Sequence, residues 1–220
     1  MRDLKHNKYL RTLYFRYRLF LDNWSYKNGT GNKVINKGAK VKSKIQITGN
    51  NNTIEIEKGA LIKDTKIRIR GNHNSLHIKK GAFISGAELW IEDNNCKLEV
   101  GENTFVGPSH LAVTEDNSSL IIGSECMLSS NINIRTGDSH SIIDIEGGKY
   151  NRINPARDIF IGEHIWIGEG AKIMKGVTLK KDIIVSSGAI VTSSFENNVL
   201  VGGIPAHIIK QNVTWNKERL

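Results

Sequence analysis

Apolar and polar residues alternate in a pattern that repeats along the middle of the chain. The repeat has units of 22, 22, 23 and 22 residues, which start at Gly49, Gly71, Asp93 and Asp116. Each unit joins an Asn-rich or Asp-rich corner to a short alternating segment such as Ile54-Glu55-Ile56. Alternation with a period of two is typical of a strand with one buried face. Because one unit cannot bury its apolar face alone, the repeat predicts stacked coils of β-structure.

The period changes near residue 161, where apolar residues begin to recur at every sixth position. One set comprises Ile161, Ile167, Ile173, Leu179, Val185 and Val191. A second set comprises Ile165, Ala171, Val177, Ile183, Ala189 and Phe195. A helix returns the same face after 3.6 residues, so a hexad is wrong for a helix but suits short strands separated by tight corners. We interpret the 22-residue units as the same kind of coil with a longer corner.

The N-terminal arm, residues 1–29, follows a helical period instead. A helix over residues 5–22 is predicted by the apolar residues that share one helical face: Leu10, Leu13, Tyr14, Tyr17 and Leu21. Residues 1–27 carry seven Lys or Arg and two Asp, a net of +5 out of the chain's +9. We favour a helix packed on its own protein or on a neighbouring subunit, with peripheral contact to an anionic membrane surface as an open alternative. No nucleic-acid motif accompanies the charge, so we expect no nucleic-acid partner.

Composition narrows the class of protein. The 220 residues are 39% hydrophobic and 24% charged. No apolar run approaches the roughly 18 residues that a membrane span requires, so we expect no transmembrane segment. Charges interrupt the N-terminal region where a signal peptide would need an apolar stretch, so the expected location is cytoplasmic, with the inner face of the membrane as the alternative. The two cysteines, Cys96 and Cys126, are too far apart to indicate a disulfide scaffold or a thiolate zinc site.

Several stretches of the chain resemble known proteins. Residues 161–168 (IGEHIWIG), 173–177 (IMKGV) and 202–206 (GGIPA) look like the hexapeptide-repeat acyltransferases. The stretches RTGDSHSIID (135–144), YNRINPARDI (150–159) and IIKQNVTW (208–215) are similar to the branch that O-acetylates sialic acids and capsular or other surface polysaccharides. The resemblance is strong over 130–215, weaker over 30–129 and absent over the arm.

This resemblance implies an all-β fold, a left-handed parallel β-helix that follows the helical arm. Irregular coils are expected over 30–137, a catalytic loop over 138–158, regular hexad coils over 159–200 and a C-terminal tail over 201–220. The family further implies an O-acetyltransferase that uses acetyl-CoA as donor and a surface polysaccharide as acceptor. It also implies a homotrimer, with active sites in the clefts between neighbouring β-helices. The acceptor sugar and its hydroxyl, the acyl chain length and the role of the arm stay open.

Acetyl transfer to a hydroxyl needs a base, donors for the oxyanion and a place for the carrier. His140 lies in a polar loop just before the regular coils, and a neutral imidazole suits a base that works near neutral pH. With the family motif, we predict that His140 is catalytic and that Asp138 or Asp144 orients its second nitrogen. Trp166 is expected to point outward beside the cleft. Its indole could form a wall for the thioester or stack on a sugar, and its backbone amide could donate to the oxyanion. A plain packing role is the alternative. His164 and His207 are better explained as structural.

The predicted carrier site follows from an 18-residue coil, which would place Gly168, Ser186 and Ile204 in one column. Small residues in that column would leave backbone amides open to an extended pantetheine, which could pair like an added strand. Ser187 belongs to the same site, and Lys210 would contact the phosphates, with Lys172 or Lys180 as alternatives.

Neither cysteine has a neighbouring histidine to activate it, so direct transfer in a ternary complex is preferred to an acetyl-enzyme. No metal site is expected. Two alternatives remain: an acetyltransferase for a small sugar, nucleotide sugar or antibiotic, and a non-catalytic carbohydrate-binding β-helix.

Overall fold

A computed structural model describes residues 26–146 and 150–220. The predicted helix over 5–22 therefore lies outside the described residues. Residues 26–28 form a first strand that pairs in parallel with the second coil, so the described repeat begins before the predicted boundary at residue 30. Among the described residues, no helix is long and apolar enough to cross a membrane.

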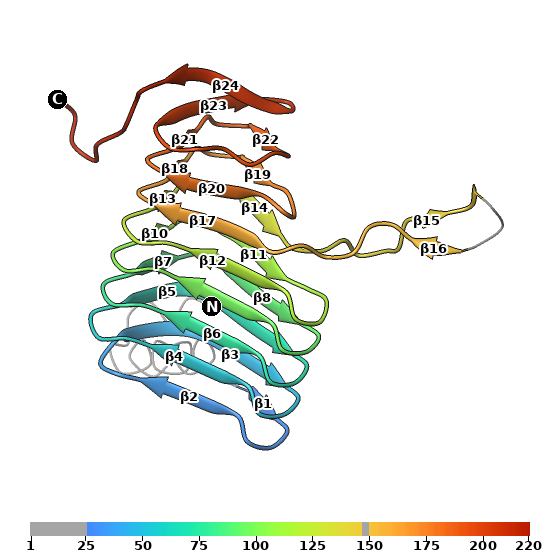
Figure 1. Ribbon diagram of the computed structural model, residues 1–220. Helices are drawn as coiled ribbons and strands as arrows, with labels where there is room; N and C mark the ends of the chain where they lie inside the picture. The colour runs from blue at the N-terminus through green and yellow to red at the C-terminus, as the bar shows by residue number, and fades with distance from the viewer. Residues whose placement is uncertain (1–25, 147–149) are drawn as a thin grey trace, which may run out of the picture.

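The chain winds into a stack of coils whose strands form two long sheets (Figure 1). The larger sheet has 15 strands and bends around one edge of the stack, because β5 (Leu61–Arg70) pairs with β7 through its first residues and with β8 through its last. One wing continues through β1 (Tyr26–Asn28), β3 (Lys40–Thr48), β8 (Glu88–Glu92), β11 (Ser109–Val113), β14 (Ile132–Arg135), β19 (Lys172–Ile173) and β22 (Ile190–Val191). The other continues through β7 (Phe83–Ser85), β10 (Phe105–Val106), β13 (Met127–Leu128), β18 (Trp166–Ile167), β21 (Ile184–Val185), β23 (Val199–Gly203) and β24 (Ala206–Gln211).

The second sheet closes the third side of the stack. Its seven strands are β2 (Lys33–Asn36), β4 (Thr53–Ile56), β6 (Ser75–Ile78), β9 (Lys97–Val100), β12 (Ser119–Ile122), β17 (Ile159–Glu163) and β20 (Thr178–Lys181). All pairs within it are parallel, and the alternating segments predicted from the repeat are strands β4, β6, β9 and β12.

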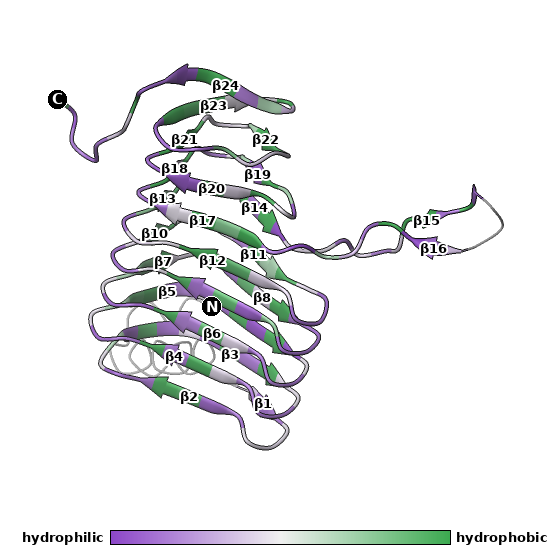
Figure 2. Ribbon diagram, viewed as in Figure 1, coloured by the Kyte–Doolittle hydropathy of each residue, from purple (hydrophilic) through white to green (hydrophobic). Residues whose placement is uncertain are grey.

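Inward-pointing aliphatic residues fill the space between the three sides. Both hexad sets predicted from the sequence point into this core: the residues of the first are all buried, and only Phe195 of the second is partly exposed. Figure 2 shows the resulting alternation of hydrophobic and hydrophilic residues along the strands. Stacking thus buries what a single coil leaves exposed, which confirms the reason for predicting a repeat.

The corner that follows the second sheet requires glycine where the coils come closest. A Cβ atom on Gly123 would lie 2.4 Å from the carbonyl oxygen of Gly162, and a Cβ atom on Gly162 would lie 1.5 Å from that of Lys180. No side chain fits at such distances, so Gly101, Gly123 and Gly162 stack above one another in successive coils.

Two antiparallel pairs depart from the parallel pattern. Strands β15 (Ile143–Asp144) and β16 (Asn151–Arg152) pair as a hairpin that stands out from the stack (Figure 1). It occupies the predicted loop 138–158, between the end of β14 and the start of β17. Strand β24 folds back antiparallel on β23 at the C-terminal end of the stack. The predicted tail boundary at residue 201 falls inside β23, so most of the tail's first half belongs to the sheet.

Candidate active site

His140 lies at a polar cavity where the hairpin leaves the stack. The cavity has a volume of about 320 Å³ and brings together residues of three successive coils. Its lining residues are Glu92, Asp93, Thr114, Glu115, Arg135, Asp138, Ser139, His140, Ser141 and Arg152. The predicted catalytic residues His140 and Asp138 therefore share one cavity, and both are exposed.

The floor of this cavity is set by buried polar contacts at the end of β14. Thr136 Oγ1 accepts a hydrogen bond from the Thr114 amide at 2.9 Å and donates one to the Thr114 carbonyl at 3.1 Å. Gly137 follows, and a Cβ atom there would lie 2.6 Å from Thr114 Oγ1. The threonine and the glycine thus let the chain pass close to the coil beneath before it turns outward into the loop.

Asp138 fixes the base of the loop. Its Oδ2 accepts hydrogen bonds from Lys175 Nζ at 2.6 Å and from Asn154 Nδ2 at 2.7 Å. Buried Asn154 also donates to the His140 carbonyl at 2.8 Å and accepts from the Ile142 amide at 2.7 Å. These donors, Lys175 first, hold the pKa of Asp138 below its ordinary value. Asp138 therefore positions the backbone that carries His140.

The orientation of the His140 ring stays a prediction. Within the described ranges, no hydrogen bond joins this ring to Asp138 or to Asp144. Asp138 is engaged as above, and Asp144 accepts from the Glu146 amide at 2.9 Å.

The other face of the cavity is closed by an ion pair. Arg152, at the end of the hairpin, donates through both terminal nitrogens to Glu115, at 2.7 and 2.5 Å. This contact lowers the pKa of Glu115, with burial opposing it and the Ala156 amide adding to it. Sequence reasoning missed Asn154, Lys175 and Arg152, although Asn154 and Arg152 lie in the stretch 150–159 that carried the resemblance.

Trp166 lies outside this cavity. It stands on β18, 41% exposed, so its outward orientation is confirmed. Its aromatic neighbour is Trp215, with ring centroids 6.1 Å apart. Among the residues that line the cavity of His140, Trp166 is absent, so this chain by itself does not bring the two predicted catalytic side chains together.

A cluster of polar and aromatic side chains adjoins Trp166. His164 stacks on Trp215 at 4.4 Å between centroids, and its Nδ1 lies 2.7 Å from Asp182 Oδ1. Thr214 Oγ1 donates to the same carboxylate oxygen at 2.9 Å, and Trp215 Nε1 donates to the His164 carbonyl at 2.9 Å. Burial raises the pKa of Asp182, but these hydrogen bonds outweigh it and the net pKa is lowered. The cluster fastens the C-terminal segment to the corner of the coil and gives His164 the structural role expected of it.

The predicted carrier column differs from the observed register. Gly168 and Ser186 are neighbours, but the next coil pairs Val185 with Val201, which places Gly202 after Ser186. The prediction of Ile204 in this column is wrong, because the last step is 16 residues long, from Ile184 to Leu200, and not 18.

The amides expected to meet the carrier are already used by the sheet. Those of Gly168 and Ser186 donate to carbonyls of the next coil, at 2.8 and 2.9 Å. Ser187 is exposed beside them, Ile204 is 74% exposed at the turn after β23, and Lys210 is exposed on β24. Their contact with a carrier stays a prediction.

Both cysteines are buried inside the stack. Burial raises the pKa of Cys96 and of Cys126 to about 11 in each case. Near neutral pH their thiols are protonated and therefore poor nucleophiles.

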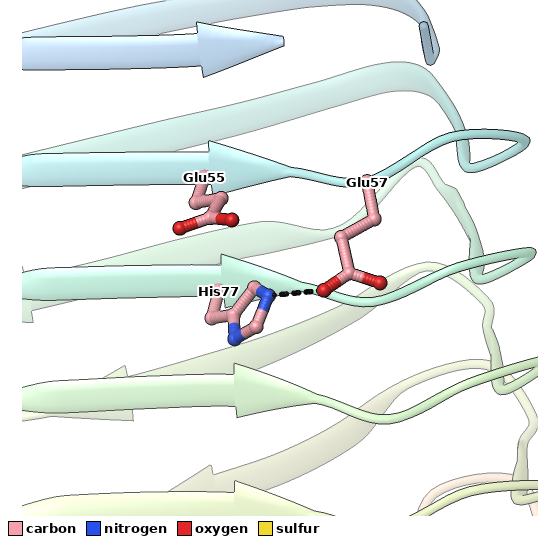
Figure 3. Close-up of side chains that lie close together, drawn as sticks. All are labelled: Glu55, Glu57 and His77. Carbon is pink, nitrogen blue, oxygen red and sulfur yellow. Dashed lines mark hydrogen bonds and ion pairs between the residues drawn. The ribbon is translucent and has the colours of Figure 1, made fainter. Parts of the chain in front are cut away.

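One group of side chains has the composition of a metal site. Glu55, Glu57 and His77 come from β4, the turn after it and β6, and their ligand atoms lie within 4.8 Å of one another (Figure 3). His77 Nε2 lies 2.8 Å from Glu57 Oε1, and Lys37 pairs with Glu55. Partners within the protein thus already occupy atoms that would bind a metal, and we assign no ligand to the group.

Comparison with known proteins adds to this geometry. No family model matches the chain. A polysialic acid O-acetyltransferase of Escherichia coli O1:K1 / APEC is 43% identical over 91 residues, which are 41% of this chain and 29% of that relative. The match thus spans under a third of the curated relative's length.

Two solved structures are similar over most of their length. The polySia-specific acetyltransferase NeuO has 30% sequence identity and a TM-score of 0.81, with 90% of each chain covered. The polysialic acid O-acetyltransferase OatWY has 26% identity and a TM-score of 0.74, covering 90% of this chain and 93% of that one. These matches confirm the left-handed parallel β-helix expected from the sequence.

Proposed function

Because the chain belongs to the hexapeptide-repeat acetyltransferases, in the branch of the polysialic acid O-acetyltransferases, we propose that it transfers an acetyl group from acetyl-CoA to a hydroxyl of a polysaccharide sugar. The observation that carries this proposal is the cavity of His140. It joins an exposed imidazole to a polar lining that suits a sugar, on a loop held in place by Asp138 and Asn154.

In the proposed reaction, His140 accepts the proton of the acceptor hydroxyl while the hydroxyl oxygen attacks the thioester carbonyl. The tetrahedral intermediate collapses, the carbon–sulfur bond breaks, and the coenzyme A thiolate takes the proton from the imidazolium. Both substrates are bound together, and no acetyl-enzyme forms, in keeping with the protonated state of Cys96 and Cys126. A positioned base of this kind contributes about 100- to 10,000-fold to the rate.

We propose further that the active enzyme is a homotrimer in which a neighbouring copy brings Trp166 to the cavity of His140. The separation of these two side chains in one chain supports this arrangement. The hairpin supports it too, because it carries a group of exposed apolar side chains: Ile142, Ile143, Ile145, Tyr150 and Ile153. Exposed apolar groups of this kind mark interaction sites.

The test is acetyl transfer by the pure protein. We expect mass spectrometry of polysialic acid incubated with acetyl-CoA and the protein to show added acetyl groups. His140→Ala should lower the rate by about 100- to 10,000-fold and leave binding of acetyl-CoA unchanged. The matched control is His110→Ala, which changes a histidine on β11 that lies 3.5 Å from Glu88 and outside the cavity.

The outcomes separate the candidates. Near-normal turnover in His140→Ala would overturn the assignment of the base. Binding of polysialic acid without acetyl transfer by the unaltered protein would favour the carbohydrate-binding alternative. Transfer only to small sugars would favour the small-molecule alternative.

A further inference from the structure

Two arginines line the His140 cavity: Arg152 pairs with Glu115, whereas Arg135 has no carboxylate partner among the described residues. We propose that its guanidinium binds the carboxylate of an acidic sugar and so positions the hydroxyl that is to be acetylated. This inference rests on the proposed function and deepens it, because it assigns the feature of the acceptor that the site recognises.

The position of Arg135 follows from the register of the parallel strands. It is the last residue of β14 and points outward, in a column with Ala112, Trp90 and Arg68 on the coils beneath. The neighbour directly beneath is Ala112, whose short side chain is buried. Arg135 lines the same cavity as His140, five residues further along the chain.

The carboxylates that line the cavity have hydrogen-bond or ion-pair partners other than Arg135. Glu92 pairs with Arg70 at 3.5 Å, and Asp93 accepts from the Glu115 amide at 3.0 Å. Glu115 and Asp138 are held by Arg152 and Lys175, as described above. Across residues 26–146 and 150–220, no carboxylate lies within ion-pair distance of Arg135, whose Nη2 donates to Ser139 Oγ at 3.2 Å.

Two buried polar atoms in the cavity have no hydrogen-bond partner among the described residues. One is Arg135 Nε, and the other is the Oγ1 of Thr114, a residue that is only 8% exposed. Leaving a buried donor without a partner costs free energy, so such atoms in a native fold call for an explanation. The described residues therefore leave part of the hydrogen-bonding capacity of the Arg135 side chain unused.

A carboxylate suits the guanidinium of Arg135 better than a neutral group does. The guanidinium presents its donors in a planar fork that matches the two carboxylate oxygens, and such charge-assisted pairs are roughly twice as strong as neutral hydrogen bonds. Sialic acid carries one carboxylate per residue. A carboxylate held at Arg135 would place the hydroxyls of the same sugar, or of its neighbour in the polymer, beside His140.

The experiment compares a sialic acid trimer with the same trimer after reduction of its carboxyl groups to alcohols. For the unaltered full chain we expect the reduced trimer to have a KM about ten- to a hundredfold higher, with little change in kcat. For Arg135→Gln we expect the KM for the acidic trimer to rise to that of the reduced trimer, so that discrimination is lost. Arg135→Lys, which keeps the charge but loses the fork, should restore part of it.

Arg68→Gln is the matched control. Arg68 stands in the same column three coils away, roughly 14 Å at the usual spacing of strands, and pairs with Glu88 at 3.1 Å. The Arg68→Gln variant should discriminate between the acidic and the reduced sialic acid trimer as the unaltered protein does. The circular dichroism spectrum and the KM for acetyl-CoA show whether each variant is folded.

Calorimetry that measures binding of the acidic and the reduced sialic acid trimer separates this inference from the proposed function. Turnover with equal discrimination in Arg135→Gln and the unaltered protein would overturn the inference and leave the acetyltransferase standing. Binding of the acidic trimer that depends on Arg135, without acetyl transfer, would uphold the inference and overturn the function. Absence of both binding and turnover would overturn both.

Discussion

At the scale of single residues, two donors converge on one oxygen of Asp138. Lys175 comes from the regular coils and Asn154 from the segment that follows β16, so this carboxylate ties the base of the hairpin to the body of the stack. The carboxylate must be ionised to accept both contacts. The arrangement therefore makes the anchoring of His140 dependent on pH.

We predict that Asp138 titrates below its ordinary pKa of 3.8 and that Lys175→Met moves the titration upward, because the largest cause of the shift is lost. A lowered folded-state pKa adds stability above the unfolded-state pKa, and this contribution disappears as the pH falls through the folded-state value. The anchoring therefore contributes fully above the ordinary pKa of 3.8 and is lost as the pH falls through the lower folded-state pKa of Asp138.

Carbon NMR of the Asp138 carboxyl group measures this directly. Lys172→Met, which removes an exposed lysine on β19, serves as the control and should leave the titration unchanged. Equal titration midpoints in the Lys175 variant and the unaltered protein would show that the ion pair does not form in solution.

At the scale of elements, the corners of neighbouring coils lie so close together that some positions have no room for a Cβ atom. We predict that Gly162→Ala destabilises the protein by about 3 kcal/mol, because the added Cβ would meet the Lys180 carbonyl and the backbones of two coils must separate. Gly188→Ala meets no atom within 4 Å but keeps a φ of +72°, so it should cost about 1 kcal/mol of conformational strain.

Urea unfolding of both variants checks the comparison. A Gly188 variant less stable than the Gly162 variant would mean that backbone strain, and not contact between coils, dominates at these corners.

The elements also show how far the sequence could predict the structure. Inward positions such as Ile167 and Val185 follow from periodicity alone, because burial repeats with the coil. Ile204 was misplaced because counting assumes a constant coil length, whereas the last step is two residues shorter. The Gly147-Gly148 pair between alternating residues is a hairpin signal that could have revealed β15 and β16.

The candidate site was only partly predictable, for a related reason. His140 and Asp138 were found within one short motif. The contacts of Asp138 with Lys175 and of Arg152 with Glu115 span 37 residues each, and a single sequence does not reveal such pairs. The fastening of Trp215 to His164 spans 51 residues and escaped prediction likewise.

At the scale of the whole molecule, the hairpin and the stack present different surfaces. The stack buries its aliphatic residues, while the hairpin exposes Ile145 and Tyr150, at 77% and 87%. In the proposed trimer each copy would cover the hairpin of the next. Three such heterologous interfaces form a closed ring, so no hairpin is left uncovered.

We predict that the double variant Ile145→Ser, Tyr150→Ser shifts the trimer towards monomer and lowers acetyl transfer at least tenfold, while the melting temperature of the stack changes little. Light scattering coupled to size-exclusion chromatography measures the mass. Ile209→Ser, an exposed position on β24, is the control and should remain trimeric. A monomeric unaltered protein with full activity would contradict the proposed assembly.

The hairpin interrupts the chain but not the sheet. Leu120 pairs with Ile159, 39 residues later, in the same register that links Leu98 to Leu120 over 22. The hairpin between His140 and Asn154 is therefore an insertion, which a segment of another length could replace without shifting the register of any later strand. Exchange of this single insertion would change the surface offered to a neighbouring copy, while the coils beneath it keep their register.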